Sequence, residues 1–196
     1  GADPHRRHRG GAGAARAAVV RSTCPPRAID MTRAAVGLAR PSTSIGLAPR
    51  ALWRRTLSAR GIPERSLLGF RDRAHSGGLE LFRCSEVRLA SEDGHAGHRG
   101  YVTDLLERML AGDSVATAAV YACGPPAMLE AVRALCEERD VAAELAMESP
   151  MACGYGACFG CAIPLRGGGY TRLCIDGPVV RADAIETALV AGAGHR

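Results

Sequence analysis

The chain has 196 residues, 47% hydrophobic and 23% charged, which suits a globular protein of one ordinary domain with a small appendage. Its net charge of +5 is unevenly distributed, because residues 1–44 hold eight Arg and two acidic residues while residues 45–196 hold 17 Arg and 18 acidic residues. A nucleic-acid-binding role would depend on the first 44 residues, which lack aromatic side chains to stack on bases, so we expect no nucleic-acid partner.

Residues 1–44 show no apolar periodicity of helix or strand and are rich in Arg, Ala, Gly, His and Pro. We interpret them as an irregular arm, and the start at Gly1 as a cut or processed one. No apolar run approaches the length of a membrane span, and none of signal-peptide length follows Arg6 and Arg7. We therefore expect a cytoplasmic protein that does not bind a membrane.

From Ile45 onward the apolar residues become periodic. The predicted elements, in chain order, are a helix, two strands, a helix, a strand, a helix and a strand, at 47–57, 66–70, 87–90, 101–110, 115–123, 127–139 and 142–147. Strands that alternate with helices imply a parallel sheet with helical crossovers. We predict an α/β fold with a Rossmann-like nucleotide-binding domain at 45–147 and a small lobe at 148–196. Ligands of such a sheet bind at the carboxyl ends of its strands.

Four of the eight cysteines form a compact pattern, C-x4-C-x2-C and then a further Cys after twelve residues: Cys153, Cys158, Cys161 and Cys174. This spacing matches plant-type [2Fe–2S] ligation. Two irons bridged by sulfides need four thiolates, converging from one tight loop and one distant strand. Small residues would let the amides of that loop turn inward, and the loop has Gly154, Gly156, Ala157 and Gly160. We predict that the four cysteines ligate a [2Fe–2S] cluster.

Two alternatives use the same cysteines. Structural zinc sites usually show paired C-x2-C knuckles, and only one such pair occurs here. Disulfides need an oxidising compartment, which the lack of a signal peptide disfavours. Of the other cysteines, Cys123 ends the most apolar strand and precedes Gly124-Pro125, so it is expected at the carboxyl edge of the sheet. A buried thiol is the alternative there, as it is for Cys24, Cys84 and Cys136.

Several segments of the chain match one family. They are Leu68–Arg71, Glu92–Gly94 with Gly97–Gly100, Tyr121–Pro125 with Met128-Leu129, Met147–Cys161 and Cys174–Val179. Through them, residues 45–180 resemble the electron-transfer (iron–sulfur) subunit of the two-subunit, NAD-linked dihydroorotate dehydrogenase, which belongs to the ferredoxin reductase superfamily.

The resemblance implies a redox role in pyrimidine synthesis. In that family an amino-terminal barrel holds FAD, the sheet domain binds NADH and the carboxyl-terminal loop holds a [2Fe–2S] cluster. Electrons pass between NADH, FAD, the cluster and the FMN of a partner subunit that oxidises dihydroorotate to orotate. By this resemblance the four cysteines are the ligands, and the cofactor contacts are Gly46, Ala48, Pro49, Cys123, Gly124 and Pro125. Glu92, Asp93 and Gly94 are weaker candidates, and no catalytic acid or base is implied.

The chain departs from the family in two places. The flavin barrel takes roughly a hundred residues, which an arm of 44 irregular residues cannot form, so we expect the flavin domain to be missing or shifted out of frame. Ser42-Thr43-Ser44 stand where the family has three glycines before the nucleotide loop, so we expect weakened NAD binding. We predict an electron-transfer subunit that is inactive alone. The alternatives are a subunit serving another flavin dehydrogenase and a zinc-stabilised binding module.

Overall fold

The computed structural model describes residues 34–39, 52–53, 55–57, 59–76, 79–82, 86–112 and 118–190. Its strands are β1 Ala34–Ala39, β2 Glu64–Phe70, β3 Glu86–Ser91, β4 His98–Arg99, β5 Ala118–Cys123, β6 Ala142–Ala146, β7 Ala162–Pro164, β8 Tyr170–Arg172 and β9 Val179–Arg181. Its α-helices are α2 Val102–Leu110, α3 Pro126–Glu138 and the single turn α4 Leu173–Asp176. Short 3-10 turns lie at Arg73–His75, Leu79–Phe82 and Ala182–Ala184.

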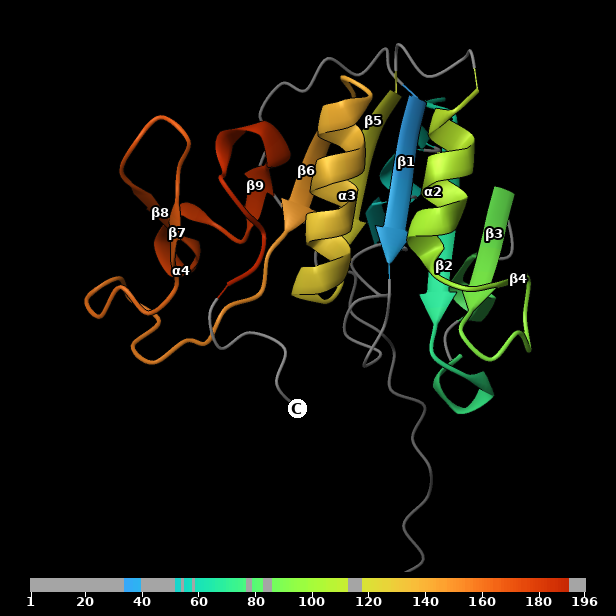
Figure 1. Cartoon of the computed structure of the whole chain (residues 1–196), viewed down its shortest axis with the longest axis horizontal. Coiled ribbons are helices and arrows are strands. Elements are labelled where there is room, and N and C mark those ends of the chain that lie inside the picture. Colours follow the sequence, from blue (N-terminus) through green and yellow to red (C-terminus); the bar gives the residue numbers. More distant parts are fainter. Residues whose placement is uncertain are drawn as a thin grey trace, which may run out of the picture.

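Seven strands form one sheet, in the order β4-β3-β2-β1-β5-β6-β9 (Figure 1). All neighbours are parallel except β6 and β9, which are antiparallel. The α/β fold with a parallel sheet is therefore confirmed. The predicted helices at 101–110 and 127–139 and the strands at 66–70, 87–90 and 142–147 correspond to observed elements within a few residues.

The interpretation of residues 1–44 as wholly irregular is wrong at β1. This strand lies in the middle of the sheet, where it pairs with β2 on one side and with β5 on the other. Its sequence, AAVGLA, has little of the β-branched and aromatic content typical of strands. Pairing along both edges decides the conformation of such a strand, and a single-sequence pattern does not contain that information. The α/β domain thus includes residues 34–39, and the rest of the arm lies outside the described residues.

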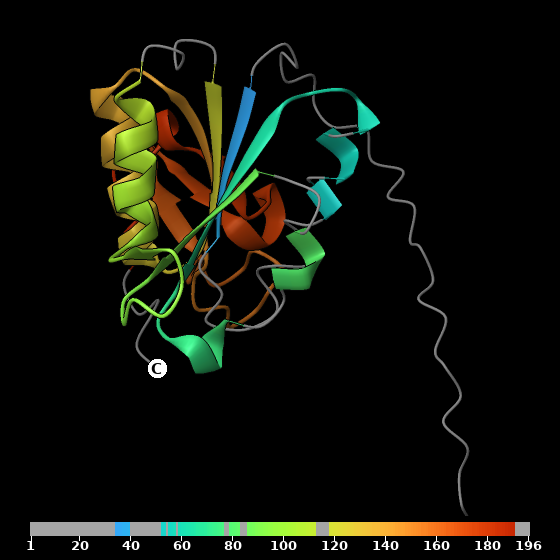
Figure 2. The same ribbon diagram turned by 90° about the vertical axis from the view of Figure 1, so that its right-hand side faces the viewer.

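The two faces of the sheet are covered by different segments. Figure 2 shows α2 and α3 together on one side, where their apolar residues pack on Leu67, Val120 and Leu145 in the main core. On the opposite side Trp53, from the helical residues predicted at 47–57, contacts the ring of Tyr121 with the centroids 5.3 Å apart. Both faces are buried, as a parallel sheet requires.

The segment after β6 leaves the sheet and then returns to it. It forms the β7–β8 hairpin, which is separate from the main sheet, and β9 then pairs with the edge strand β6. Ile163, Leu173 and Ile185 from this segment are buried in the same core cluster as α3. The predicted boundary between residues 147 and 148 remains a prediction, and the lobe beyond it shares the core of the sheet. Within the described ranges, no helix is long and apolar enough to cross a bilayer.

Candidate iron–sulfur and nucleotide sites

The carboxyl edge of the sheet contains a point where the strand order reverses. From β1 the chain proceeds to β2 and β3 on one side, and it returns to β5 on the other side. The last pair in the register of β1 with β5 is Ala39 with Cys123, so both strands end at the same level. Ligands of open parallel sheets bind at such a crevice. Cys123 therefore lies at the carboxyl edge of the sheet, as the sequence predicted, and a ligand contact there remains a prediction.

The turn from β5 into α3 brings the backbone close to this edge. Gly124 is buried, Pro125 is the N-cap of α3, and Pro126 occupies its first turn, where proline is tolerated because its missing N–H would have no helical partner. The beginning of α3 is consequently at the predicted nicotinamide side. The predicted loop contacts Gly46, Ala48 and Pro49 lie outside the described residues, although they follow β1 closely in sequence.

Two Asp–His pairs follow the neighbouring strands. Asp72, after β2, accepts hydrogen bonds from the backbone N–H of His75 at 3.2 Å and lies 2.7 Å from its ring Nδ1, and these contacts lower its pKa. Asp93, after β3, accepts the N–H of His95 at 3.0 Å, and this bond and the nearby ring lower its pKa to about 2. Sequence reasoning missed Asp72 as an edge residue. Its position directly after the predicted strand 66–70 was the available signal.

The cluster loop starts from the end of β6. The backbone N–H of Met147 donates to the carbonyl of Pro178 at 2.8 Å, which ties the start of this loop to the segment that leads into β9. The β7–β8 hairpin then brings two cysteines close together, because Cys161 immediately precedes β7 and Cys174 follows β8 in α4. Their sulfur atoms are 3.3 Å apart.

The other two cysteines form a second pair. The backbone N–H of Cys158 donates to the sulfur of Cys153 at 3.4 Å, and that of Gly160 donates to the sulfur of Cys158 at 3.4 Å. Amide donors from Cys158, Tyr155 and Ala157 lower the pKa of Cys153 to about 6. An amide of Cys174 likewise lowers the pKa of Cys161. The loop therefore favours the thiolate form, which binds metal, at Cys153 and Cys161, whereas the hydrogen bond from Cys161 raises the pKa of Cys174.

Two glycines give the loop this shape, as the sequence predicted. Gly154 and Gly156 have φ of 73° and 85°, in the left-handed region that favours glycine. A Cβ at Gly156 would also overlap the side chain of Ile175, next to Cys174. The guanidinium of Arg172 donates to the carbonyl of Gly156 at 3.1 Å and lies 5.1 Å from the centroid of the Phe159 ring, so the loop is fastened to β8.

The donor set fits a two-iron cluster. The cysteines come as two pairs, Cys153 with Cys158, joined by an amide-to-sulfur hydrogen bond, and Cys161 with Cys174, whose sulfurs are in contact, and these pairs would offer two ligands to each of two irons. A tetrahedral zinc site would need four thiolates around a single point. The amides directed at the sulfurs are suited to disperse the negative charge of a cluster.

Comparison with known proteins agrees with this geometry. Residues 148–186 match the family model described as the iron–sulfur cluster binding domain of dihydroorotate dehydrogenase B. Residues 72–134 match the model of the oxidoreductase NAD-binding domain. A protein of Caldanaerobacter subterraneus subsp. tengcongensis is 39% identical over 103 residues, which are 51% of this chain and 40% of that protein. It is described as the electron transfer subunit of dihydroorotate dehydrogenase B (NAD(+)). The two family-model matches together give the chain an oxidoreductase NAD-binding domain and the cluster binding domain of this family.

Further relatives with the same description match over a longer stretch. The Bacillus caldolyticus protein is 38% identical over 145 residues and the Listeria welshimeri protein 35% over 144, each match covering 72% of this chain and 54% of the relative. The chain thus spans about half the length of these electron transfer subunits. A solved structure of an NADH-dependent reduced ferredoxin-NADP oxidoreductase has a TM-score of 0.67 at 22% identity, over 81% of this chain and 56% of the other, and this likeness concerns the fold alone.

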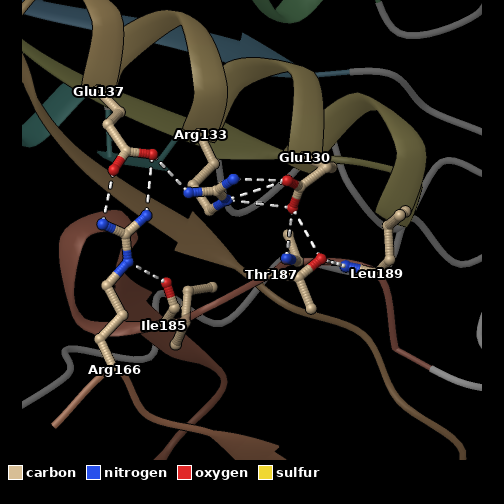
Figure 3. Close-up of polar contacts among 8 residues, drawn as sticks. Glu130, Arg133, Glu137, Arg166, Ile185, Thr187 and Leu189 are labelled. Carbon is tan, nitrogen blue, oxygen red and sulfur yellow. Dashed lines mark hydrogen bonds and ion pairs between the residues drawn. The ribbon is translucent and has the colours of Figure 1, made fainter.

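A charged network attaches the segment after β6 to α3 (Figure 3). Arg133 donates to Glu130 at 2.7 and 3.1 Å and to Glu137 at 2.7 Å. Glu130 also accepts from the hydroxyl of Thr187 at 3.0 Å and from the backbone N–H of Ala188 at 2.6 Å. Two carboxylates on one helix therefore face the lobe, with a single arginine between them.

Because of this network, we expect the free energy of unfolding of the chain to decrease in mild acid. The pKa of Glu137 is lowered from 4.5 to about 2 by Arg166 and Arg133, and that of Glu130 is lowered mainly by Arg133. A carboxylate whose folded pKa is lowered stabilises the fold above its unfolded pKa and loses this effect as the pH falls through the folded value. Thermal unfolding between pH 7 and pH 3 should therefore show a loss that begins near pH 4.5. The Glu130→Gln/Glu137→Gln variant should show a smaller loss, and an equal loss in both proteins would contradict the assignment.

Proposed function

We propose that this chain is the NAD-binding and cluster-binding part of an electron transfer subunit that relays electrons between NADH, a flavin and the FMN of a dihydroorotate dehydrogenase catalytic subunit. The main support for this proposal is the arrangement of the four cysteines as two pairs. Backbone amides donate to the sulfurs of Cys153 and Cys158. The cluster loop also starts at the end of β6, whose last pair in the register with β5 is Ala146 with Cys123. A nucleotide edge and a cluster loop thus begin on adjacent strands.

Each group of residues has a defined role in this proposal. Cys153, Cys158, Cys161 and Cys174 ligate the [2Fe–2S] cluster, which when bound accepts and releases one electron at a time. Amide donors of the loop stabilise the thiolates, and Arg172 fastens the loop through the carbonyl of Gly156. At the sheet edge Cys123, Gly124 and Pro125 would contact the nicotinamide of bound NAD. The side chains supply no acid or base, because the transfer moves electrons between cofactors.

The oxidation of dihydroorotate by NAD⁺ determines which partner this chain needs. Dihydroorotate loses two electrons and two protons to become orotate, and NAD⁺ takes up two electrons and one proton while the second proton is released to water. The proposed sites of this chain bind NAD and a cluster, and neither binds dihydroorotate. The oxidation of dihydroorotate therefore requires a flavin-containing catalytic subunit, and the functional unit is a hetero-oligomer. We propose that this assembly acts in the cytoplasm, which a role in pyrimidine synthesis favours. Because the 44 residues of the arm cannot form a flavin barrel, the FAD would be bound outside these 196 residues.

The visible spectrum of the anaerobically reconstituted chain tests the cluster. A [2Fe–2S] centre gives broad sulfide-to-iron charge-transfer bands, with about two irons and two sulfides per chain. A colourless protein with one zinc per chain would overturn the proposal in favour of a zinc-stabilised module. The partner is tested by mixing the reduced chain with a flavin-containing catalytic subunit and following FMN reduction. Failure to reduce FMN, with an intact cluster, would indicate an electron carrier for another dehydrogenase.

The nucleotide loop provides a further prediction. Ser42, Thr43 and Ser44 each add a Cβ where the family has glycine next to the pyrophosphate, and each such position costs about 1 kcal/mol or more. We expect weak NADH binding by titration calorimetry, and binding tighter by roughly 30- to 150-fold, equivalent to about 2–3 kcal/mol, when all three residues are changed to Gly. The matched control is Ser58→Gly, which changes a serine outside this loop. Tight binding that the triple change leaves unaltered would show that these residues do not contact the pyrophosphate.

A further inference from the structure

The β7–β8 hairpin connects the cysteine pair to a residue at its opposite end. Cys161 and Cys174 flank the open end, whereas Arg166 lies in the turn that joins the two strands. Three residue pairs, from Ala162↔Arg172 to Pro164↔Tyr170, hold the strands together. The turn is closed by the N–H of Leu165, which donates to the carbonyl of Gly169 at 3.1 Å. The hairpin is therefore short and paired along its length, so a shift of Arg166 in its turn would also shift Cys161 and Cys174 at its open end.

Arg166 is held at several points. Its Nη1 and Nη2 donate to the two carboxylate oxygens of Glu137 at 2.5 and 2.8 Å, which is the bidentate geometry of strong arginine–carboxylate pairs (Figure 3). Its Nε donates to the carbonyl of Ile185 at 2.9 Å, and its backbone N–H donates to the carbonyl of Ala184 at 3.0 Å. One side chain thus joins the hairpin turn, helix α3 and the segment after β9.

Helix α3 links this contact to the nucleotide edge. Its first turn directly follows Gly124-Pro125, its second turn begins near Glu130, and Glu137 is close to its carboxyl end. Glu130 binds Thr187 and Ala188 of the lobe, and Glu137 binds Arg166. Because Arg133 bridges the two carboxylates, the same helix contacts the lobe at two places along its length.

We propose that Arg166 and Glu137 are positioning residues for the cluster. Through the hairpin they determine where Cys161 and Cys174 lie relative to α3 and hence to the nucleotide edge. This inference rests on the proposed function, because it takes the four cysteines as cluster ligands. The pair is half exposed, with 40% and 50% of the two side chains accessible. An isolated pair of that exposure contributes little to stability, so the expected effect is on the hairpin and its cluster more than on global unfolding.

The test compares Arg166→Met with Arg181→Met in the full reconstituted chain. Arg181 forms an exposed pair with Asp183 in the same lobe, and no hydrogen bond or ion pair described for its side chain reaches α3, so it is a matched control. For Arg166→Met we expect iron release to a chelator to be about 3- to 10-fold faster, together with faster amide exchange across 162–172. We also expect a broadened EPR signal of the reduced cluster. Arg181→Met should resemble the wild-type protein in all three measurements.

Two more variants keep the test decisive if Arg166→Met folds poorly. Glu137→Gln should reproduce the faster iron release, although it also weakens the contact of Glu137 with Arg133. The double variant should release iron about as fast as the faster single variant, because both changes remove the contact between Arg166 and Glu137. Equal release rates in Arg166→Met, Arg181→Met and wild type would overturn the positioning role. A wild-type chain that binds no cluster would instead overturn the proposed function.

Discussion

Replacing Cys158 with Ser should abolish the visible spectrum of the cluster and lower iron from about two per chain to nearly none. Cys158 is exposed, its sulfur accepts the N–H of Gly160, and its own N–H donates to the sulfur of Cys153. Its loss would leave one iron with a single thiolate. The lobe should also become less stable, because so small a unit depends on its metal for part of its folding free energy.

The matched control for this prediction is Cys136→Ala. Cys136 is buried in the main core on α3, and burial raises the pKa of its thiol to about 12, so it is a small apolar side chain and no ligand. This variant should keep the full spectrum at a modest cost in stability. Cys158→Ala should be measured beside Cys158→Ser, since a serine oxygen can itself bind iron. A normal spectrum in Cys158→Ala would refute the assignment of this residue as a ligand.

The second large effect is expected at Gly97, in the turn between β3 and β4. Gly97 has φ of 67°, and a Cβ there would lie 2.7 Å from the carbonyl carbon of Leu89 and still closer to its oxygen. Those atoms belong to the backbone of β3, which pairs with β2 and β4 and cannot move aside. Gly97→Ala should therefore lower the free energy of unfolding by about 3–5 kcal/mol, measured by urea denaturation.

Gly61→Ala separates the two causes of this loss. Gly61 has nearly the same φ of 68°, but a Cβ there would meet nothing within 4 Å. Its replacement by alanine should cost about 1 kcal/mol from backbone strain alone. If the two alanine variants lost equal stability, the contact with Leu89 would have no energetic importance. The Gly97 turn also carries Glu92 and Asp93 at the sheet edge, so its distortion should further weaken NADH binding.

The sequence by itself determined the chemistry of the site. C-x4-C-x2-C with a distant fourth Cys specifies four thiolates, and Gly154 and Gly156 specify a loop that can adopt the left-handed conformation around them. It also determined the longer strands and helices from residue 64 to 147, because their apolar residues recur with the periods that each element requires, but not the two-residue strand β4 or the 3-10 turns. Cys123-Gly124-Pro125 could be placed at the sheet edge because a buried strand ends there.

The tertiary structure alone decided which distant segments meet. β1 is a strand because β2 and β5 pair with both of its edges, although its own residues are poor strand formers. β9 reaches the sheet through pairing with β6, and Arg166 reaches Glu137 across 29 residues of chain. Local patterns encode the conformation of each segment through its own side chains. Contacts such as these depend on surfaces that exist only after the sheet and α3 have formed, so they could not be predicted from the sequence.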